Sequence, residues 1–291
     1  MGIRARSGGK VKTFALALGG GGARGLAQIA IIEALDELGV KPVAIAGVSV
    51  GAAIGAAYAA GMRGKAMRRH VIDIAHNRPE TFARLYAARA VGLTELFGAG
   101  FGNPMVLDAE RLSAAFLPAA IPARFEDLAI PLSISATDLS ARSEVVFTAG
   151  PLKLPIAASL AVPGLLQPVV IADRILVDGA ALNPLPFDRL RGCADMIVAI
   201  DSSVGPTEAR GVPGPWEALF ATIQVVAHAM VTQKLKDGAP DLLIRPNVGI
   251  FRVLDFLRAS AILRAAEPVK AEVKDRLGAL LDLNAAHEKS P

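Results

Sequence analysis

Two glycine-rich motifs, each placed between an apolar run and a helical pattern, constrain the fold of this chain more than any other feature. The first motif, at residues 19–25, follows an apolar run at 13–18, and the second, at 47–51, follows one at 43–46. Residues 26–38 between them carry apolar side chains at helical spacing and end at a glycine. A strand, a helix and a second strand in this order predict a right-handed crossover, and therefore a parallel sheet.

The second motif has the sequence Gly-Val-Ser-Val-Gly and predicts a nucleophile elbow. In such an elbow, a sharp turn between a strand and a helix lifts a serine hydroxyl clear of the sheet. Ser49 is therefore the candidate nucleophile, and the flanking Gly47 and Gly51 keep side chains away from an approaching substrate. Because a serine hydroxyl is a weak nucleophile, the chemistry also needs a general base and donors for the oxyanion.

The first motif has three interpretations. Gly20, Gly22 and Gly25 have the spacing of a dinucleotide-binding loop, but no acidic residue ends the second strand to hold a ribose. A phosphate-binding P-loop is excluded because no Gly-Lys-Ser/Thr follows. The third interpretation is an oxyanion hole, in which the N–H groups of Gly20, Gly21 and Gly22 face developing negative charge. Arg24 either reinforces that field or fixes the loop by hydrogen bonds, and we favour the structural role.

The general base has several candidates. Asp178 ends a strand-like run and is followed by Gly-Ala, a tight turn that aims its carboxylate; Asp201 and Asp138 also end or follow strands. Each of these acids has the alternative role of a turn or capping residue. The order Ser49, Asp178, His228 matches that of the α/β-hydrolase triad. However, His228 lies inside a helical apolar pattern, which favours a structural histidine.

The composition is that of a globular protein, with 53% of the 291 residues hydrophobic and 20% charged. The formal net charge of +4 is modest for this length, so we expect no nucleic-acid partner. The single cysteine, Cys193, excludes an intramolecular disulfide framework and a cysteine-rich metal site. Its position before an apolar run predicts a small core residue.

The chain shows no pattern typical of a targeting or membrane-spanning segment. The apolar run at 14–18 is too short for a signal-peptide core. Residues 43–60 contain no charge, but a buried strand, an elbow and a core-packed helix explain them better than a membrane span. We expect a cytoplasmic protein, with peripheral contact at the inner membrane face left open.

The rest of the chain divides into a basic tail at 1–12, a catalytic core at 13–205 and a C-terminal helical extension at 206–291 packed on that core. Within the core, residues 62–106 form either a cover over the site or a plain connecting insertion. The helical stretch 63–89 carries a net charge of +5. Further strands are expected at 132–136, 145–148, 169–171, 175–177, 196–200 and 242–244, further helices at 50–60, 108–117, 156–161 and 216–236, and Gly- or Pro-rich loops at 98–104 and 206–215.

Taken in order, these motifs resemble those of the patatin-like phospholipases, especially the compact bacterial members. The resemblance rests on the glycine loop at 20–25, the elbow at 47–51 and the Asp-Gly-Ala at 178–180. Residues 136–139 and 158–163 also look like blocks of this family. Together they span about two-thirds of the chain, and the ordered set is far more specific than any single motif.

The resemblance implies a three-layer α/β/α sandwich with a mainly parallel central sheet. It implies a catalytic dyad, with Ser49 as nucleophile, Asp178 as its direct base and the amides of 20–22 as the oxyanion hole. The implied substrate is a phospholipid or another fatty-acyl ester, hydrolysed with no metal and no organic cofactor. The elbow departs from the family at Val48 and Val50, where many members have Thr and Ala, and Val50 is expected to narrow the site.

Two alternatives remain open. One is a small-ester esterase with a triad that includes His228, and the other is a regulatory protein that keeps the fold without turnover. A third question concerns the basic stretch 63–89, which either attracts an anionic membrane surface or forms a solvated helix face. The membrane interpretation predicts that charge reversal at Arg68 and Arg69 weakens vesicle binding.

Overall fold

The structure of the chain is a computed structural model that describes residues 12–89, 107–203, 212 and 214–282. The predictions for the tail at 1–12 and for the loops at 98–104 and 206–215 lie wholly or mostly outside these residues. The described helices are α1 (Gln28–Leu38), α2 (Val50–Ala59), α3 (Gly64–His76), α4 (Arg78–Ala87), α5 (Ala109–Phe116), α6 (Lys153–Leu160), α7 (Pro215–Lys236), α8 (Ala259–Ala265) and α9 (Val269–Leu280).

The described residues form one eight-stranded sheet. Its strands are β1 (Phe14–Leu18), β2 (Ile45–Val48), β3 (Leu132–Asp138), β4 (Ser143–Phe147), β5 (Val169–Ile171), β6 (Arg174–Asp178), β7 (Met196–Ile200) and β8 (Leu242–Ile244). The order is β5-β6-β3-β2-β1-β7-β8, and β4 also pairs with β3. The five strands β3, β2, β1, β7 and β8 run parallel, whereas β4 and β6 are antiparallel to β3. The predicted mainly parallel α/β fold is confirmed.

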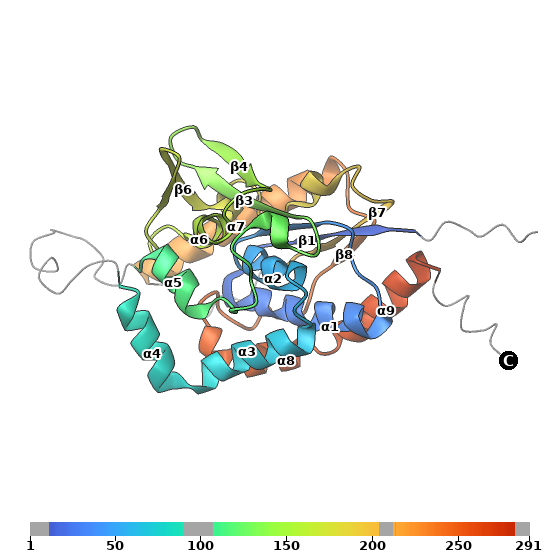
Figure 1. Cartoon of the computed structure of the whole chain (residues 1–291), viewed down its shortest axis with the longest axis horizontal. Coiled ribbons are helices and arrows are strands. Elements are labelled where there is room, and N and C mark those ends of the chain that lie inside the picture. Colours follow the sequence, from blue (N-terminus) through green and yellow to red (C-terminus); the bar gives the residue numbers. More distant parts are fainter. Residues whose placement is uncertain (1–11, 90–106, 204–211, 213, 283–291) are drawn as a thin grey trace, which may run out of the picture.

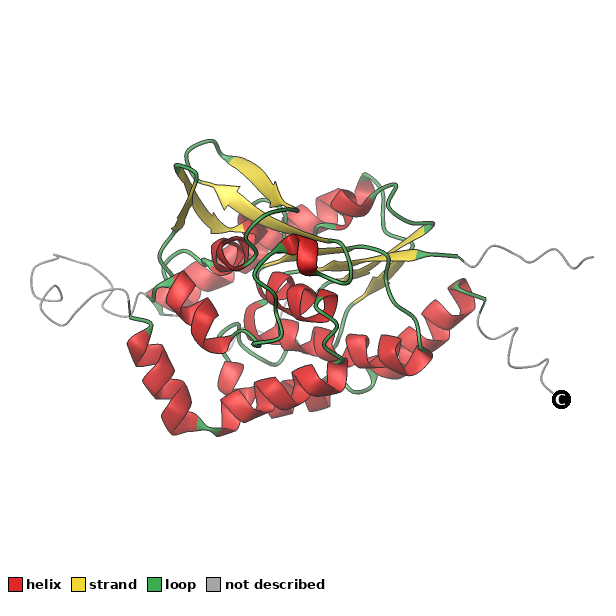
Figure 2. Ribbon diagram, viewed as in Figure 1, coloured by secondary structure: helices red, strands yellow, loops and turns green. Residues whose placement is uncertain are grey.

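The alternation of side chains along β1 shows how the layers are built. Leu16 and Leu18 lie in the large core formed with α1, α2, α8 and α9. Ala15 and Ala17 point to the opposite face, where they pack with Phe187 of the 3₁₀ turn η4 (Phe187–Leu190) and with the C-terminal half of α7. Figures 1 and 2 show α1, α2 and α9 as a layer on one side of the strands. Small alanines therefore line the face of β1 that packs against η4 and α7.

The segment after the first glycine motif forms the predicted helix, but two boundaries in this region differ from the pattern. Residues Gly22–Ala27 form a 3₁₀ turn, η1, so the α-helix begins at Gln28 rather than at residue 26. The second strand is Ile45–Val48 and runs into the elbow itself. The first crossover is as predicted, because β1 and β2 are neighbours and pair in parallel.

The basic stretch 63–89 forms α3 and α4, and α3 packs on α1 and α8. Arg68 donates two hydrogen bonds, of 2.6 and 2.7 Å, to the carboxylate of Glu33, whose side chain is 3% exposed. It also pairs with Glu267 at 2.8 Å. Arg68 is therefore an ion-pair partner of a buried carboxylate, and the choice between a membrane-facing and a solvated surface for the stretch 63–89 stays a prediction.

Two further observations concern the surface. Cys193 is exposed, so the prediction of a small core residue is wrong. Its backbone N–H closes the turn after η4 by donating to Leu190 O at 3.0 Å, and the side chain points away from the core. Among the residues that the structure describes, none of the helices has the length and apolar character that crossing a bilayer requires.

Candidate active site

Ser49 lies at the turn between β2 and α2, as the elbow motif predicts. Its backbone has φ 55° and ψ −130°, a strained region for a residue other than glycine, and it is 5% exposed. The Ser49 N–H donates to Ser159 Oγ at 2.8 Å, and the Ser159 hydroxyl donates to Ser135 O at 2.7 Å. The hydroxyl of Ser159 thus ties the elbow to β3 and α6, and it is fully buried.

The elbow glycines are required by two close backbone approaches, that of α2 to the end of β1 at Gly51 and that of β2 to the first turn of α2 at Gly47. A Cβ atom at Gly51 would lie 2.3 Å from Leu18 O and 2.7 Å from Gly19 O. A Cβ atom at Gly47 would lie 2.7 Å from Gly51 O. These neighbours are backbone atoms, so neither position accepts a side chain without displacement of the elbow or of the glycine loop.

Ser49 and Asp178 are joined directly. The Ser49 hydroxyl donates to Asp178 Oδ2 at 2.7 Å, and the other carboxylate oxygen accepts the Ala180 N–H at 2.8 Å. Asp178 is itself 5% exposed. The carboxylate is therefore held by the turn that follows it, in the orientation that a general base for Ser49 needs.

Strand β3 brings these two residues together although 129 positions separate them. Val48, which precedes the elbow serine, is paired with Ser135 of β3 in the parallel ladder. Asp178 is paired with the next residue of β3, Ala136, in the antiparallel ladder. The carboxyl ends of β2 and β6 thus meet at consecutive positions of one strand, which sets the separation of the two side chains.

Burial raises the pKa of Asp178 to about 6 from its ordinary value of 3.8. The hydrogen bonds from the Ser49 hydroxyl and the Ala180 N–H oppose this shift, because they stabilise the charged form. The carboxyl group consequently changes its protonation state about one pH unit below neutrality. At neutral pH it is mainly a carboxylate that can accept the proton of Ser49.

The glycine loop lies against Ser49, since a Cβ atom at Gly20 would be 3.5 Å from Ser49 Cβ. The N–H of Gly20 donates to Pro184 O at 3.0 Å and is not available to a substrate oxygen. Among the described residues, the N–H groups of Gly21 and Gly22 donate to no partner. Both have positive φ, 151° and 57°. Of the three amides predicted to form the oxyanion hole, Gly21 and Gly22 therefore remain as candidate donors.

Arg24 fixes this loop to α7. Its guanidinium donates to Gly21 O at 3.4 Å and to Gln224 Oε1 at 2.5 Å, and the residue is 5% exposed. Burial lowers the pKa of Arg24 to about 10, although Asp201 partly compensates. The group remains a cation at neutral pH, and its hydrogen bonds are those of the structural role that the sequence favours.

Two supports of the glycine loop have no signal in the sequence. Gln28 Nε2 donates to Gly19 O at 2.7 Å and to Ser202 Oγ at 3.2 Å. The N–H of Ala23 donates to Val253 O at 2.7 Å, although the two residues are far apart in the sequence. These contacts join the loop to the end of β7 and to the segment before α8, and only the assembled fold reveals them.

The other candidate bases lie outside this arrangement. Asp201 pairs with Arg245 at 2.9 Å, and Asp138 accepts the N–H groups of Ser140 and Ala141 at 2.9 Å. Asp201 also accepts the Ser203 N–H at 2.9 Å, so both acids have the turn role that was their alternative, and Asp201 is an ion-pair partner as well. Within the described part of the chain, His228 forms no hydrogen bond with Ser49 or Asp178, and its Nδ1 is buried without a partner. The geometry does not assemble a triad.

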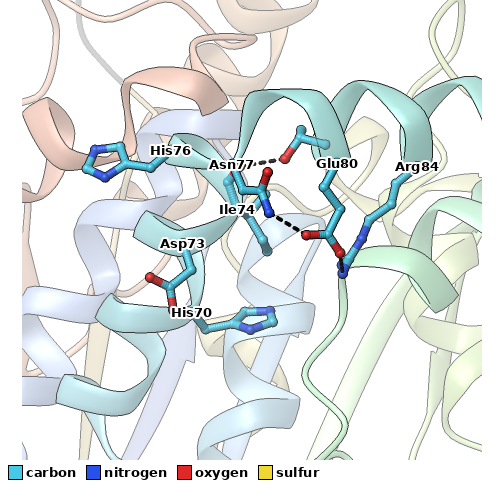
Figure 3. Close-up of a pocket in the computed structure, with 8 residues that line it drawn as sticks. His70, Asp73, Ile74, His76, Asn77, Glu80 and Arg84 are labelled. Carbon is cyan, nitrogen blue, oxygen red and sulfur yellow. Dashed lines mark hydrogen bonds and ion pairs between the residues drawn. The ribbon is translucent and has the colours of Figure 1, made fainter.

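One cavity of about 450 Å³ lies at the corner between α3 and α4 and contains none of the residues above. Figure 3 shows His70 and Asp73 on α3 and Glu80 and Arg84 on α4 around it. His70 Nε2 is 2.9 Å from Phe116 O, and Arg84 donates to Ala115 O at 2.7 Å. These two side chains therefore cap the C-terminus of α5. In the described residues no group of three metal-ligating side chains gathers.

Comparisons with known proteins show which proteins this chain is similar to. A family model described as Patatin-like phospholipase matches residues 16–191. An uncharacterized NTE family protein of Mycobacterium tuberculosis is 38% identical over 196 residues, 66% of this chain and 50% of that protein. Lysophospholipase NTE1 of Coccidioides immitis is 25% identical over 293 residues, 91% of this chain and 18% of that protein. The chain thus spans half the length, or less, of these curated relatives.

Among solved structures, VipD from Legionella pneumophila aligns with 92% of this chain and 67% of its own, with a TM-score of 0.48 and 14% sequence identity.

Proposed function

The chain belongs to the patatin-like phospholipase family, and from this premise we propose that it hydrolyses fatty-acyl esters of phospholipids through Ser49. The observation that carries the proposal is the 2.7 Å hydrogen bond from Ser49 Oγ to Asp178 Oδ2 inside a strained, buried elbow. The similarity to a lysophospholipase supports a phospholipid or lysophospholipid as substrate. No metal or organic cofactor has a part in the proposed reaction.

The proposed reaction has two steps. Ser49 Oγ attacks the ester carbonyl carbon while its proton passes to Asp178 Oδ2, and the Gly21 and Gly22 amides stabilise the oxyanion. The tetrahedral intermediate then collapses, and Asp178 returns the proton to the departing alcohol. In the second step Asp178 takes a proton from water, which attacks the acyl carbonyl carbon. Collapse of this second intermediate releases the fatty acid, and Asp178 returns the proton to Ser49 Oγ. Each oxyanion donor in such a site contributes roughly 10²–10³ in rate.

The test of this proposal is fatty-acid release from mixed micelles of phosphatidylcholine or lysophosphatidylcholine, measured by mass spectrometry. Wild type is expected to release fatty acid, and Ser49→Ala to lose at least about 10³-fold of that rate, because the nucleophile is absent. Ser133→Ala is the matched control, since Ser133 is a β3 serine whose hydroxyl donates to Ile45 O at 3.4 Å and, among the described residues, forms no hydrogen bond with Ser49 or Asp178.

The same assay separates the dyad from its rival. His228→Ala is expected to keep the wild-type rate, because the proposed proton transfer is direct. An inactive His228→Ala that remains folded would instead support a triad. Absence of fatty-acid release by wild type on either substrate would contradict the proposal and favour a non-catalytic protein on this fold.

A further inference from the structure

Six exposed, large apolar side chains lie on two segments that hold the glycine loop. One segment is residues 217–226 of α7, and the other is the stretch 245–258 between β8 and α8, which includes the turn η5 (Phe256–Arg258). We call these residues the apolar rim: Leu219, Val225, Val226, Ile250, Leu254 and Phe256.

Both segments contact the loop that borders Ser49. Val253 O accepts the Ala23 N–H at 2.7 Å, and Gln224 accepts a hydrogen bond from Arg24 at 2.5 Å. The two segments are also linked to each other, because Arg252 lies 3.7 Å from Glu217. The rim residues are therefore sequence neighbours of the groups that fix the glycine loop, and the two segments that carry them each contact that loop.

The exposure of the rim is high for apolar side chains. Ile250 is 72% exposed and Val225 68% exposed, whereas Ser49 beside the loop is 5% exposed. Contiguous exposed apolar residues on a globular protein usually mark a surface that binds a partner or a membrane. Here the rim residues lie on segments that contact the loop beside the buried Ser49. A lipid substrate must reach Ser49 from a bilayer or a micelle.

The charges around the rim indicate what covers it. The stretch 245–258 contains three arginines and one aspartate. Arg245 pairs with the buried Asp201, Arg252 with Glu217 at 3.7 Å and Arg258 with Asp255 at 3.4 Å. The side chains of Arg252 and Arg258 are nevertheless 79% and 57% exposed, so both can also reach a lipid phosphate. Arginines interleaved with exposed Ile, Leu and Phe favour binding to the boundary between lipid headgroups and acyl chains, with added attraction to anionic lipids.

We propose that the apolar rim is the surface by which this protein docks on a phospholipid bilayer that contains anionic lipid. Ile250, Leu254 and Phe256 enter the headgroup region, and Arg252 and Arg258 contact lipid phosphates. The rim then holds the glycine loop and Ser49 at the bilayer surface. This inference rests on the proposed function for its substrate, and it names a different surface from the stretch 63–89, where Arg68 is paired with the buried Glu33.

The test is co-sedimentation of the full chain with vesicles of phosphatidylcholine, with and without phosphatidylglycerol. The Ser49→Ala variant is used so that no lipid is consumed. The double variant Ile250→Ser/Phe256→Ser is expected to reduce the vesicle partition coefficient about tenfold, because it removes two apolar side chains from the docked surface. Binding is also expected to be stronger with phosphatidylglycerol and to weaken with salt.

The matched control is Val170→Ser/Ile175→Ser on the β5–β6 hairpin, where two apolar side chains are 62% and 43% exposed away from the rim segments. This control is expected to bind vesicles like its parent. Equal binding of the rim variant and the control, or no binding of the parent to either vesicle, would overturn the proposal. A third outcome would also overturn it: a parent that is a dimer and a rim variant that is a monomer but still binds vesicles. The rim would then be the contact between two copies of the chain.

Hydrolysis of a short-chain, water-soluble ester separates docking from catalysis. With an intact Ser49, the rim variant is expected to hydrolyse this ester at the wild-type rate, while its rate on vesicles falls with its binding. If the proposed function is wrong, wild type hydrolyses neither substrate, yet the loss of vesicle binding by the rim variant is still measured. The two failures are therefore distinguishable.

Discussion

Replacing Asp178 by Asn is expected to lower the kcat for ester hydrolysis by about 10⁴-fold, because an amide cannot accept the Ser49 proton. The asparagine side chain has nearly the same shape as aspartate, and its amide can still form a hydrogen bond with the Ser49 hydroxyl. The loss is therefore expected in kcat, with KM close to that of wild type. Steady-state kinetics on a soluble ester measure both constants. A variant that retains a tenth or more of the wild-type kcat would contradict the role of Asp178 as base.

The same substitution is expected to stabilise the fold above pH 6. Because burial raises the pKa of Asp178 from 3.8 to about 6, the folded protein holds its proton more tightly than the unfolded chain does. This tighter proton binding stabilises the folded state. The stabilisation is complete below about pH 4 and is lost as the pH rises through 6. The difference of about 2 pH units corresponds to about 3 kcal/mol of unfolding free energy at neutral pH and above.

An Asn at this position stays neutral, so its advantage over Asp is expected at about pH 8 and not at about pH 4. Urea unfolding of both proteins at the two pH values measures it. Asp138→Asn is the matched control, because Asp138 is also buried and accepts two backbone N–H groups at a strand end. It is expected to gain no stability. An Asp178→Asn variant that is less stable than wild type at the higher pH would contradict the account of the buried charge.

The second large effect is expected at the elbow, where Gly51→Ala should destabilise the fold by about 3 kcal/mol or more. The new Cβ atom would lie 2.3 Å from Leu18 O, and backbone at the end of a central strand cannot move without breaking its ladder. The glycine loop would be displaced with it, because Gly19 O is 2.7 Å away. Urea unfolding measures the loss of stability, and circular dichroism reports whether the variant folds.

Gly55→Ala in the same helix is the matched control. A Cβ atom at Gly55 would lie 3.2–3.4 Å from methyl groups of Ile45, Leu18 and Leu132, which can shift by a few tenths of an ångström. The gain in helix propensity, about 1 kcal/mol, offsets this crowding, so the net effect is expected to be small. Equal destabilisation by the two substitutions would show that the close approach at Gly51 is not what fixes the elbow.

The features that sequence analysis predicts correctly here are local ones. Apolar runs, helical spacing and the positions of glycines give β1, α1, β2 and the elbow, because each depends on neighbouring residues. The hairpin β5–β6 and the strand Leu242–Ile244 follow from the same kind of pattern. The motif order then indicates the family, which the match over residues 16–191 confirms.

The features that the sequence does not reveal depend on contacts between distant residues. Ser159 lies 110 positions from Ser49, and Ala23 meets Val253 only once α8 and its preceding segment are packed. The engagement of the Gly20 N–H by Pro184 O also depends on a distant turn. The sequence therefore indicates which loop borders the nucleophile, but not which of its amides remain free.

The net charge of the stretch 63–89 leaves two interpretations open for a related reason. Its excess of basic residues fits either a membrane-facing surface or a solvated helix face, because charge counts contain no information on pairing. Glu33 lies on α1, 35 positions before Arg68, and becomes its buried partner only when α3 packs on α1. Cys193 is the reverse case, because its apolar neighbours predict burial although it lies in the exposed turn before β7.

The most direct test of the proposed dyad is labelling of the wild-type protein by a fluorophosphonate probe, with the adduct mapped by peptide mass spectrometry and the rate followed from about pH 4 to pH 8. We predict a single adduct on Ser49, absent from Ser49→Ala. Because Asp178 accepts the proton only as a carboxylate, the rate should fall as the pH falls and be half-maximal near pH 6. An adduct on another residue, no adduct, or a rate independent of pH over this range would contradict a Ser49–Asp178 dyad.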